Sequence, residues 1–568
     1  MYKYLYKEWT ESLKLTEEER KELLQITDEK EIENRFGKDL EFGTAGMRGF
    51  IGLGTNMMNV YTVRKATQGL SEYIKGLGEQ AKERGVVISY DTRRKSYEFA
   101  YNAAIVLATN GIKAHLFSDV HPVPMLSYAV RELKTVAGIM ITASHNPKEY
   151  NGYKLYGEDG AQMSISATNE IVKYIDAIGS PLSDKILFDE KFEKKIKKVK
   201  KSVDRKYYKT IKKLCLSQKE LRKYGKQLKI VYTPVHGSGY VPVTTILKKI
   251  GIKPIVVEEQ IRKDTEFSTV EIPNPEHKET LTLGIKLADF RNADVVFGTD
   301  PDCDRLGVAI RDDGGDFVAL TGNQTGVLLL DYVLLRLKES GKLNKKGFAV
   351  KSFVTTSLAK LIAKTYGVEL MEVPVGFKFI GEKIKQLDDT GMRNFIFGFE
   401  ESCGYLRGTH CRDKDAVVAS MLFAEMCCYY AYNQMSVYDR LKDIYARYGY
   451  VYDTNVSTAY SGINAMRDMI AVVDKIKQTQ IQNIGEVTVE AVRDYSVLKR
   501  TLKDGTVEDM EGDSVNAVYY ELCNGGFVCV RPSGTEPKLK VYYSVPAKDR
   551  HTATELFSKI KQDFERYL

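Results

Sequence analysis

Three aspartates at a spacing of two follow a short apolar run: Asp300, Asp302 and Asp304. Side chains at this spacing in extended backbone point to the same side, so we expect the three carboxylates to face a common point. Hard oxygen ligands grouped in this way suit Mg²⁺. An EF-hand calcium loop is excluded, because Arg305 and Arg311 occupy the positions at which that loop requires Gly and Glu.

Ser144 and His145 lie side by side in a second polar loop, which follows another apolar run. A hydrolase nucleophile elbow needs glycine at positions 142 and 146, where this chain has Thr142 and Asn146, so acyl transfer is disfavoured. By itself the serine fits an ordinary loop. Together with a carboxylate-rich metal loop it becomes a candidate phosphoryl carrier, because a metal and nearby cations would neutralise the added charge.

A third loop contains the parts of a phosphate-binding site: an arginine, two hydroxyls and a glycine that lets backbone N–H groups approach an anion. These residues are Arg531, Ser533, Gly534 and Thr535. Near the amino terminus, glycines surround Arg48, which fits either a second anion-binding loop or a structural turn.

Carboxylates and a hydroxyl also follow the strand-like residues 394–399, at Glu400, Glu401 and Ser402. They could hold sugar hydroxyls or cap a helix. No P-loop pattern occurs in the chain, and Met57 occupies the position of the third glycine of a dinucleotide fingerprint. Nucleotide chemistry of the common kinds therefore lacks support.

Most of the chain alternates short apolar strands, glycine-containing loops and amphipathic helices, a pattern typical of α/β layers with parallel or mixed sheets. The candidate loops mostly follow the apolar strands, where such folds usually bind ligands. An apolar stretch at 416–432 is interrupted by Glu425 and is predicted to be a buried helix, too short to span a bilayer comfortably. The predicted strands lie at 86–90, 135–142, 228–232, 294–298 and 394–399.

The chain has 568 residues, of which 43% are hydrophobic and 28% are charged. This length suggests about four domains, and the composition excludes a disordered or fibrous class. Eight cysteines without a CxxC pair disfavour a disulfide framework and a structural zinc site. The amino terminus also lacks the pattern of a secretion signal. We therefore expect a cytoplasmic protein without a membrane partner.

The 84 basic and 76 acidic side chains give a net charge of +8, which fits anionic small molecules as well as nucleic acid. Residues 190–229 form the most basic segment. No aromatic platform or RNA-binding motif accompanies it in the sequence. We interpret the segment as a solvated helix that joins two domains, and expect no nucleic-acid partner.

In this order, four of the loops resemble the motifs of the α-D-phosphohexomutase superfamily, which contains the phosphoglucomutases and phosphomannomutases. The matching segments are Thr142–Pro147, Asp300–Arg305, Phe399–Gly404 and Arg531–Thr535. The resemblance extends over nearly the whole chain. It implies an α/β fold in which three related mixed-sheet domains and a smaller α+β carboxyl-terminal domain surround a central cleft. The expected domains are residues 1–205, 206–321, 322–452 and 453–568.

The resemblance also implies roles for the candidate residues. Ser144 would be a phosphoserine and would complete a Mg²⁺ site with the three aspartates. Lys154 would assist proton transfer, with His145 alongside, and Arg48 and Arg305 would lie near the transferring phosphoryl group. The residues implied in sugar binding are Gly376, Glu400 and Ser402. Those implied in holding the phosphate that does not react are Lys414, Arg531, Ser533, Gly534, Thr535 and Lys540.

The implied activity is the interconversion of glucose 1-phosphate and glucose 6-phosphate, with glucose 1,6-bisphosphate as intermediate and activator. The Glu400-Glu401-Ser402 triplet resembles a glucose-type loop more than a mannose-type loop. The chain also resembles the branch of the superfamily that includes phosphopentomutases and glucose-1,6-bisphosphate synthases, and Val375 replaces the more usual Thr of the specificity loop. Mannose and pentose phosphates therefore stay open as substrates. A non-catalytic sugar-phosphate-binding relative is the alternative from another class. In each case the partner is a sugar phosphate, bound by a monomer or homodimer.

Overall fold

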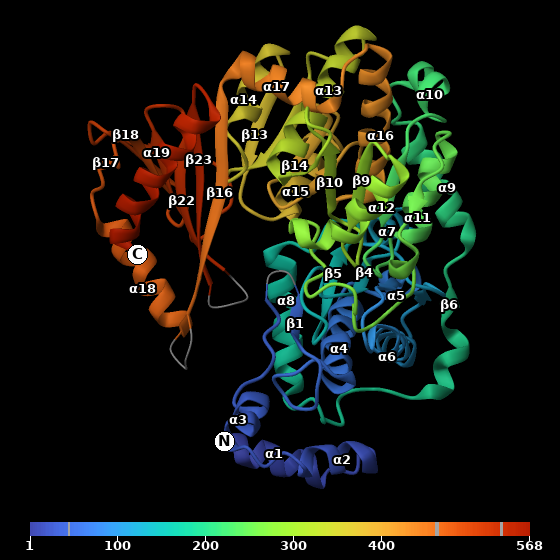
Figure 1. The fold of residues 1–568 in the computed structure, drawn as a ribbon. Coiled ribbons are helices and arrows are strands. Elements are labelled where there is room, and N and C mark those ends of the chain that lie inside the picture. Colours follow the sequence, from blue (N-terminus) through green and yellow to red (C-terminus); the bar gives the residue numbers. More distant parts are fainter. Residues whose placement is uncertain (44–45, 461–464, 534–537) are drawn as a thin grey trace. The chain divides into compact units, whose positions relative to one another are not determined.

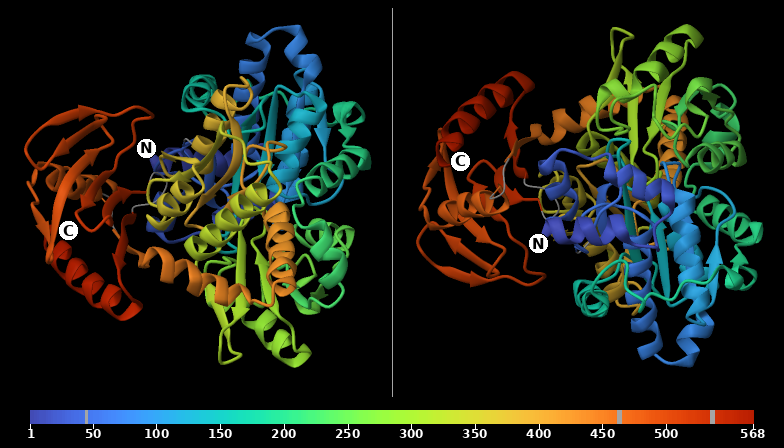
Figure 2. Two further views of the ribbon diagram at one scale, coloured as in Figure 1. Left: turned by 90° about the horizontal axis from the view of Figure 1, so that it is seen from above. Right: turned by 90° about the horizontal axis from the view of Figure 1, so that it is seen from below.

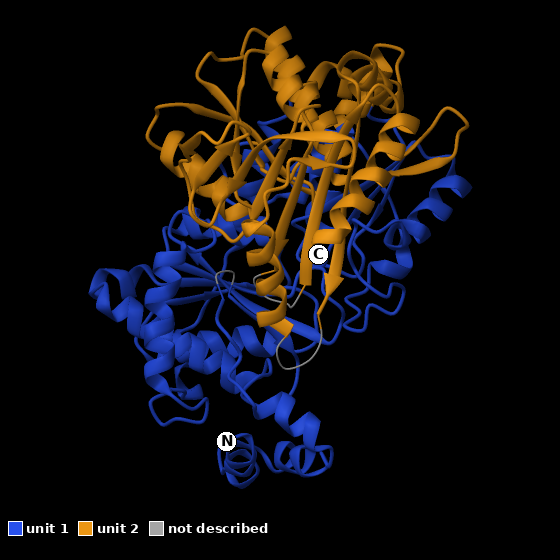
Figure 3. Ribbon diagram, turned by 90° about the vertical axis from the view of Figure 1, so that its left-hand side faces the viewer, with its two compact units in different colours: residues 1–215, 225–309, 408–424 blue, residues 216–224, 310–407, 425–568 orange. Residues whose placement is uncertain are grey.

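The computed structural model describes residues 1–43, 46–460, 465–533 and 538–568 (Figure 1). These residues pack as two compact units, which Figure 3 colours separately. Unit 1 comprises residues 1–215, 225–309 and 408–424, and unit 2 comprises residues 216–224, 310–407 and 425–568. Among the described residues, no helix is both long enough and apolar enough to cross a membrane.

Unit 1 contains a six-stranded sheet in the order β1-β5-β4-β2-β3-β6. Strands β2, β3, β4 and β6 are parallel, whereas β5 runs antiparallel to β4 and β1. The strands are β1 (Met47–Phe50), β2 (Val86–Tyr90), β3 (Ala114–Leu116), β4 (Ala137–Ile141), β5 (Tyr150–Gly157) and β6 (Lys197–Lys198). The mixed sheet predicted from the sequence is confirmed.

Helices α6 and α7 both contact this sheet. They follow β2 and β3, and right-handed crossovers in opposite directions place them on opposite faces. Helix α4 packs against α6 and α8. The helices of this part are α1 (Tyr2–Glu11), α2 (Glu17–Leu24), α3 (Glu29–Phe36), α4 (Val60–Gly76), α5 (Glu79–Arg84), α6 (Ser96–Thr109), α7 (Val123–Leu133), α8 (Ile165–Ile178), η1 (Glu190–Lys195) and α9 (Lys201–Lys212).

The basic segment thus contains a 3₁₀ turn, a short strand and the two helices α9 and α10 (Gln218–Tyr224), so the single helix expected from the sequence is wrong. The 3₁₀ turn and the short strand precede α9, so residues 190–200 do not form an α-helix. The expected domain boundary at residue 205 lies inside α9. Most of its lysines are exposed, as expected for a solvated segment.

A second parallel sheet in unit 1 contains β8, β7 and β9 in that order. Strand β10 (Leu306–Arg311) and helix α16 (Ala416–Tyr432) each run from unit 1 into unit 2. Helix α16 has the bounds predicted from the apolar stretch. The remaining elements of this region are β7 (Ile230–Thr233), α11 (Tyr240–Lys249), β8 (Ile255–Val256), η2 (Glu258–Gln260), η3 (Lys278–Leu281), α12 (Thr282–Arg291) and β9 (Val295–Thr299).

Unit 2 contains a four-stranded sheet in the order β13-β12-β14-β15, in which only β15 is antiparallel to its neighbour. The elements are α10 (Gln218–Tyr224), β11 (Phe317–Leu320), α13 (Gly322–Glu339), β12 (Gly347–Ser352), α14 (Leu358–Thr365), β13 (Glu369–Val373), α15 (Phe377–Leu387), β14 (Asn394–Glu400), β15 (Gly404–Leu406) and α17 (Val437–Tyr448).

The carboxyl-terminal part of unit 2 is an antiparallel sheet with the path β16-β23-β22-β21-β18-β19-β20, and β17 pairs with β18. Helices α18 and α19 contribute to one apolar core with this sheet (Figure 2). The elements are β16 (Tyr450–Ala459), α18 (Ala465–Gln478), β17 (Asn483–Ile484), β18 (Val487–Asp494), β19 (Lys499–Leu502), β20 (Val507–Asp509), β21 (Val518–Leu522), β22 (Phe527–Pro532), β23 (Lys538–Ala547), α19 (Arg550–Phe564) and η4 (Glu565–Tyr567).

Candidate active site

Ser144 lies in the loop after β4, at the carboxyl end of a parallel strand. Its backbone has a positive φ of 53°, a left-handed conformation that is unfavourable for a serine and often occurs at functional sites. The Ser144 N–H donates to Thr142 Oγ1 at 2.8 Å, and Thr142 Oγ1 donates to Asp91 Oδ2 at 2.6 Å. These hydrogen bonds hold Ser144 in its strained conformation.

The guanidinium of Arg93 contacts the same loop through its carbonyl groups. It donates to the carbonyl oxygen of Ser144 at 2.6 Å and to that of Pro147 at 2.8 Å. Arg93 is buried, and its Nε lies 3.3 Å from Asp91 Oδ2. Sequence reasoning missed both residues, although they directly follow the predicted strand at 86–90, a position where α/β folds bind ligands.

The aspartate loop is a turn, and the extended loop expected from the sequence is wrong. The Cys303 N–H donates to the Asp300 carbonyl oxygen at 2.9 Å, and Cys303 has a positive φ of 50°. Asp300 Oδ1 then accepts hydrogen bonds from the N–H groups of Asp304 and Arg305, at 3.1 and 3.0 Å. The turn brings carboxylate oxygens of Asp300, Asp302 and Asp304 within 4.8 Å of one another.

Ser144 contacts this aspartate cluster directly. Its Oγ donates to Asp300 Oδ2 at 2.9 Å, and Nδ1 of His145 lies 3.2 Å from the same Oγ. Burial lowers the pKa of His145 well below its usual value, and the cations of Arg305 and Arg48 lower it further. His145 is therefore neutral near pH 7, a state in which its ring has one donor and one acceptor nitrogen.

Two lysines partly neutralise the aspartates. Lys154 on β5 donates to Asp302 Oδ2 at 3.0 Å, and Lys414 Nζ lies 3.1 Å from Asp304 Oδ2. Burial raises the pKa of Asp302, but the ammonium of Lys154 and a hydrogen bond with Asp300 outweigh burial, so the pKa lies below its usual value. The ammonium of Lys414 therefore lies beside the candidate metal loop in unit 1.

The segment that carries Lys414 is fixed by carboxylates on either side of it. Asp413 accepts a hydrogen bond from the hydroxyl of Tyr156 at 2.9 Å. Asp415 accepts one from Tyr207 at 2.8 Å and also binds the first free N–H groups of α16, including that of Val417 at 2.9 Å. Sequence reasoning did not select Asp413 or Asp415, because their partners are distant in the chain.

The three aspartates fit a divalent cation. Each is at most 1% exposed, and burial together with the charges of Asp302 and Asp304 raises the pKa of Asp300 well above its usual value. Oδ1 of Asp302 and Oδ1 of Asp304 are buried and accept no hydrogen bond from the described residues. Buried oxygens without a partner are costly, and Mg²⁺ prefers such oxygen ligands. A cation bound here would satisfy both oxygens and reduce the repulsion.

Arg48 lies on β1, which pairs with β5, and its guanidinium donates to Asn146 Oδ1 at 3.0 Å. Arg48 is therefore adjacent to the Ser144 loop. Arg305, at the end of the aspartate turn, forms an ion pair with Glu276. Thus unit 1 groups Arg48, Ser144, His145, Lys154, Asp300, Asp302, Asp304, Arg305 and Lys414 through the contacts described above.

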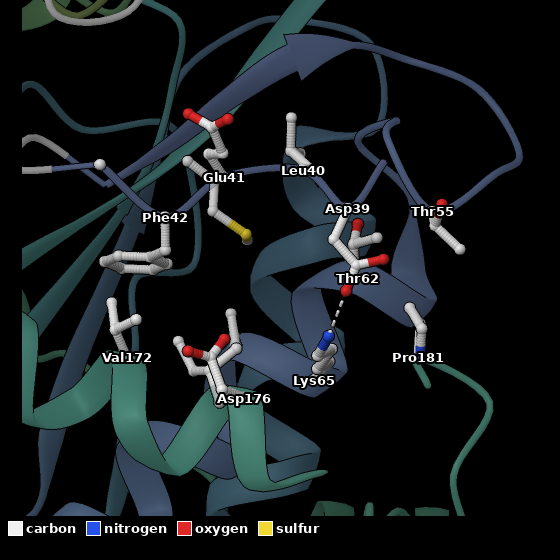
Figure 4. A pocket seen from close by; sticks show the side chains of 14 residues that line it. Asp39, Leu40, Glu41, Phe42, Thr55, Thr62, Lys65, Val172, Asp176 and Pro181 are labelled. Atoms are coloured by element: carbon white, nitrogen blue, oxygen red, sulfur yellow. Dashed lines mark hydrogen bonds and ion pairs between the residues drawn. The ribbon is translucent and has the colours of Figure 1, made fainter. Parts of the chain in front are cut away.

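The segment that leads into β1 lines a pocket of about 290 Å³ with helices α4 and α8 (Figure 4). Lys65 of α4 donates to Asp39 Oδ2 at 2.7 Å, and Figure 4 shows this bond across one end of the pocket. The side chain of Lys65 is only 10% exposed. This ion pair ties the start of the segment to α4, a few residues before Arg48.

In unit 2, the candidate sugar-binding residues lie at the ends of two neighbouring elements. Gly376 precedes α15 with a positive φ of 126°, which favours glycine, and its N–H donates to Glu400 Oε1 at 2.9 Å. Glu400 ends β14 and is buried, and Ser402 is half-buried in the turn before β15. Glu401 accepts a hydrogen bond from Ser352 at 3.0 Å.

The candidate phosphate-binding residues lie on β22 and β23. Arg531 and Lys540 are directly opposite each other across this antiparallel pair. The Ser533 N–H donates to the carbonyl oxygen of Lys538 at 2.8 Å. The predicted residues Gly534 and Thr535 lie outside the described residues.

Comparison with known proteins places the chain in a family. The family phosphoglucomutase/phosphomannomutase matches in four consecutive parts: alpha/beta/alpha domain I at residues 39–181, domain II at 205–315, domain III at 321–448 and the C-terminal domain at 470–560. The chain belongs to the phosphoglucomutase/phosphomannomutase family. The predicted architecture of three related α/β domains and a distinct carboxyl-terminal domain is confirmed. Phosphohexomutases are metal-dependent, and the aspartate cluster is a site that could bind the ion.

Curated members of the phosphoglucomutase/phosphomannomutase family resemble the chain over nearly its full length. A phosphoglucomutase of Staphylococcus haemolyticus is 36% identical over 540 residues, which cover 94% of each chain. A phosphoglucomutase of Staphylococcus aureus strain USA300 is 38% identical over 519 residues, or 91% of each chain. These relatives support an isomerase of the phosphohexomutase class.

Solved structures of other phosphohexomutases share the fold. The open form of pp63/parafusin, a phosphoglucomutase from Paramecium, has a TM-score of 0.67 at 19% identity and covers 93% of this chain and 94% of its own. A phosphoglucomutase/phosphomannomutase family protein from Burkholderia thailandensis has a TM-score of 0.66 at 18% identity, with coverage of 93% and 96%. At these identities the likeness concerns the fold alone.

Proposed function

We propose that this phosphohexomutase interconverts glucose 1-phosphate and glucose 6-phosphate through a phosphoserine at Ser144 and a glucose 1,6-bisphosphate intermediate. The observation that carries the proposal is the hydrogen bond of 2.9 Å between Ser144 Oγ and Asp300 Oδ2, within a cluster of buried carboxylates. A serine beside three buried carboxylates and the ammonium groups of Lys154 and Lys414 has the charges that phosphoryl transfer requires. The curated relatives named phosphoglucomutase support the choice of substrate.

The proposed reaction has two half-reactions of opposite direction. In the first, the bond between phosphorus and Ser144 Oγ breaks, and a new bond forms between phosphorus and the free hydroxyl oxygen of the sugar monophosphate. The sugar hydroxyl loses one proton, and Ser144 Oγ gains one. After the bisphosphate reorients, its other phosphoryl group returns to Ser144 and the proton transfers are reversed. The net proton count does not change.

Within unit 1, each side chain has a defined part in this scheme. Lys154 and His145 hold and move the protons, and Arg48 and Arg305 stabilise charge on the transferring phosphoryl group. Ser144, Asp300, Asp302 and Asp304 would hold Mg²⁺. When bound, this ion supplies a positive charge that stabilises the phosphoryl oxygens.

The residues of unit 2 would bind the substrate. Glu400 and Ser402 offer acceptors and a donor for sugar hydroxyls, and Gly376 lies against Glu400. We assign the phosphate that does not react to Arg531, Ser533, Gly534, Thr535 and Lys540, with Lys414 of unit 1 as a further cation. The proposed domains remain residues 1–205, 206–321, 322–452 and 453–568, and we propose that the enzyme acts in the cytoplasm as a monomer or homodimer.

Ser144→Ala is the direct test of the proposed mechanism. We expect its mutase activity to fall by roughly 10³-fold or more, since removal of a nucleophile eliminates the covalent route. Peptide mapping of wild-type enzyme incubated with glucose 1,6-bisphosphate should place a phosphate on Ser144. Ser166→Ala, at an exposed serine of α8, is the matched control and should keep full activity. Wild-type turnover by Ser144→Ala would refute the mechanism.

Substrate choice is tested separately, with a panel of glucose, mannose, ribose and deoxyribose 1-phosphates and a trace of bisphosphate activator. We expect the highest kcat/KM for glucose 1-phosphate. A higher value for mannose or a pentose would keep the mechanism and change the substrate. Binding without turnover of any of them would identify a non-catalytic relative.

A further inference from the structure

A cavity of about 320 Å³ lies beside the basic segment of unit 1. This volume is at the lower end of the range of small-molecule sites, roughly 300 to 1,000 Å³. Three parts of the chain form its wall: the start of α6, the end of β3 and the segment that contains η1 and β6. The lining residues are Tyr97, Tyr101, Leu116, Phe117, Ser118, Glu193, Lys194, Ile196 and Lys198.

The cavity has an aromatic wall that the sequence did not reveal. Tyr97 is 55% exposed, and its ring centroid lies 6.2 Å from that of Tyr101. Tyr90 supports Tyr97 from the side, with ring centroids 5.5 Å apart. In the sequence, these tyrosines are about a hundred residues from the basic segment, but α6 packs against η1 in the fold. The fold therefore places beside the basic segment aromatic side chains that the sequence near the segment does not contain.

The basic segment contributes cations to the lining of the cavity. Lys194 and Lys198 are exposed, and neither forms an ion pair with any described residue. Glu193 is the one acidic side chain among the lining residues. Lys195 and Lys197 flank the cavity and are also exposed. Uncompensated ammonium groups attract anions, and lysine binds phosphate as a point charge.

Apolar side chains also line the cavity. Leu116 is buried at the end of β3 and pairs in register with Lys198 of β6. Ile196 packs on the core of the six-stranded sheet. A planar aromatic ring could therefore stack on Tyr97 while its edge contacts Leu116 and Ile196. Base stacking on tyrosine and phosphate contacts to lysine are the common elements of nucleotide binding.

This cavity and the Ser144 loop occupy different positions along the same sheet. The Ser144 loop follows β4, whereas the cavity lies at the ends of β3 and β6, and β2 separates β4 from β3. The carboxyl ends of parallel strands are the usual ligand positions in α/β sheets. None of the cavity residues contacts the aspartate cluster in the bonds described above.

We propose that this cavity binds a mononucleotide, with the base stacked on Tyr97 and Tyr101 and the phosphates held by Lys194 and Lys198. The aromatic side chains distinguish this ligand class from a sugar phosphate, which has no aromatic base to stack. The two neighbouring tyrosines offer a stacking surface for a single base, whereas single-stranded RNA needs several platforms along a groove.

Calorimetric titration of the full-length enzyme with ADP tests the proposal. We expect one site, with adenosine and inorganic phosphate each binding at least tenfold more weakly than ADP. An excess of glucose 1,6-bisphosphate should not displace the nucleotide. Photolabelling with 2-azido-ADP, followed by peptide mapping, should modify peptides that contain Tyr97 or residues 190–201.

Variants of Tyr97 and of the two lysines test which side chains of the cavity bind ADP. Tyr97→Ala should weaken ADP binding at least tenfold, whereas Tyr97→Phe should keep it within threefold because the stacking face remains. The charge reversal Lys194→Glu with Lys198→Glu should weaken ADP binding at least tenfold and leave adenosine binding unchanged. The matched controls are Tyr174→Ala, at an exposed tyrosine of α8, and Lys249→Glu with Lys253→Glu, at exposed lysines elsewhere in unit 1.

Four results would overturn the proposal. They are the absence of ADP binding at millimolar concentration, equal affinity of the wild type, Tyr97→Ala and the double lysine variant, displacement of ADP by the bisphosphate, and an oligoribonucleotide that binds at least tenfold more tightly than ADP. The lysine variants alter exposed side chains and should fold normally, which circular dichroism can check. They keep the test decisive if Tyr97→Ala is unstable.

Discussion

At the residue scale, Arg93 is the side chain whose contacts extend furthest along the Ser144 loop. Its guanidinium binds carbonyl oxygens of Ser144, Pro147 and Tyr150, at 2.6, 2.8 and 3.2 Å. It also lies 3.3 Å from Asp91, which receives the hydrogen bond of Thr142. A single ammonium group cannot reach this many acceptors with the same geometry.

Arg93→Lys should therefore keep the buried charge but release part of the loop. We expect kcat to fall roughly 10- to 100-fold, since small displacements of a reacting group have effects of this size. Steady-state kinetics and the rate of Ser144 phosphorylation would measure the effect. Arg94→Lys is the matched control, because Arg94 is a neighbouring and half-exposed residue. Equal kcat values for the two variants would contradict the positioning role.

Residue spacing predicted that the three aspartates lie close together, but it predicted the wrong backbone conformation for bringing them together. The three aspartates were selected from an alternation that does not exist in the structure, where a turn with a left-handed Cys303 groups them. Arg93 and Asp413 were missed because their partners are 51 and 257 residues away in the chain. Such partners become visible only when the fold brings strands and loops together.

At the scale of elements, β1 positions Arg48, and the bond between Lys65 and Asp39 anchors the segment before it. Lys65→Met should lower kcat by about threefold to tenfold, because the strand would hold Arg48 less firmly. Stability should change by only about 1 kcal/mol or less, since Asp39 is 55% exposed and stays hydrated. Kinetics and urea unfolding would measure the two effects.

A matched control for Lys65→Met is available on the same helix. Lys75 lies on α4 and contacts Glu72 and Asn110, far along the helix from the segment before β1. Lys75→Met should leave kcat unchanged. In a double-mutant cycle, Asp39→Asn should add little to the loss caused by Lys65→Met. Additive losses would show that the ion pair does not act as one unit.

Strand β16 contains an acidic group whose ionisation opposes folding. Burial raises the pKa of Asp453 to about 6, although hydrogen bonds from Ser544 and Thr356 and the charge of Lys351 oppose the rise. In the unfolded chain the pKa of an aspartate is about 3.9. Between these values the folded state binds more protons, so the free energy of unfolding falls as pH rises from about 4 to about 6 and then levels off.

Asp453→Asn should remove this fall in the free energy of unfolding, because asparagine does not ionise. We expect the variant to be more stable than wild type by about 1 to 2 kcal/mol at pH 7.5, and nearly equal to it at pH 4.5, where the wild-type carboxyl is protonated. Urea midpoints at the two pH values would measure the difference. Asp549→Asn, at a solvent-exposed helix cap in the same part of unit 2, is a control that should not gain stability at pH 7.5. If Asp453→Asn were more stable than the wild type only at pH 4.5, the result would contradict a raised pKa of Asp453.

Elements with strong apolar patterns were predicted well. The strand predicted at 86–90 has the bounds of β2, and the helix predicted at 416–432 has the bounds of α16. Two-residue strands such as β6 were not predicted, because they carry no apolar periodicity and exist only through pairing with a neighbour. Tertiary contacts define these elements, so a local pattern cannot reveal them.

At the scale of the whole molecule, the four-part architecture could be predicted from the order of the motifs. The unit in which each segment packs could not be predicted in this way. Residues 408–424 return to unit 1 after about a hundred residues in unit 2, and they bring Lys414 to Asp304. Nothing in the composition of this segment indicates the return. The energetic reason lies in the pairing of Lys414, Asp413 and Asp415 with groups of unit 1.

At the same scale, we expect the stability of the protein to depend on a divalent cation, because the aspartate cluster has a net negative charge. Three buried carboxylates face two ammonium groups, from Lys154 and Lys414, and burial together with repulsion from Asp302 and Asp304 raises the pKa of Asp300. An ion that binds only the folded state stabilises it by about 2.7 kcal/mol at a concentration of one hundred times Kd. Mg²⁺ should therefore raise the urea midpoint of the wild type, and a chelator should reverse the gain.

Asp300→Asn removes one of the repelling charges, so in chelator it should be at least as stable as the wild type. In Mg²⁺ it should be less stable, because it lacks a ligand. The order of the two proteins in urea midpoint should therefore reverse between chelator and saturating Mg²⁺. If Mg²⁺ stabilised both proteins equally, the ion would bind elsewhere, and the three aspartates would form a purely structural cluster.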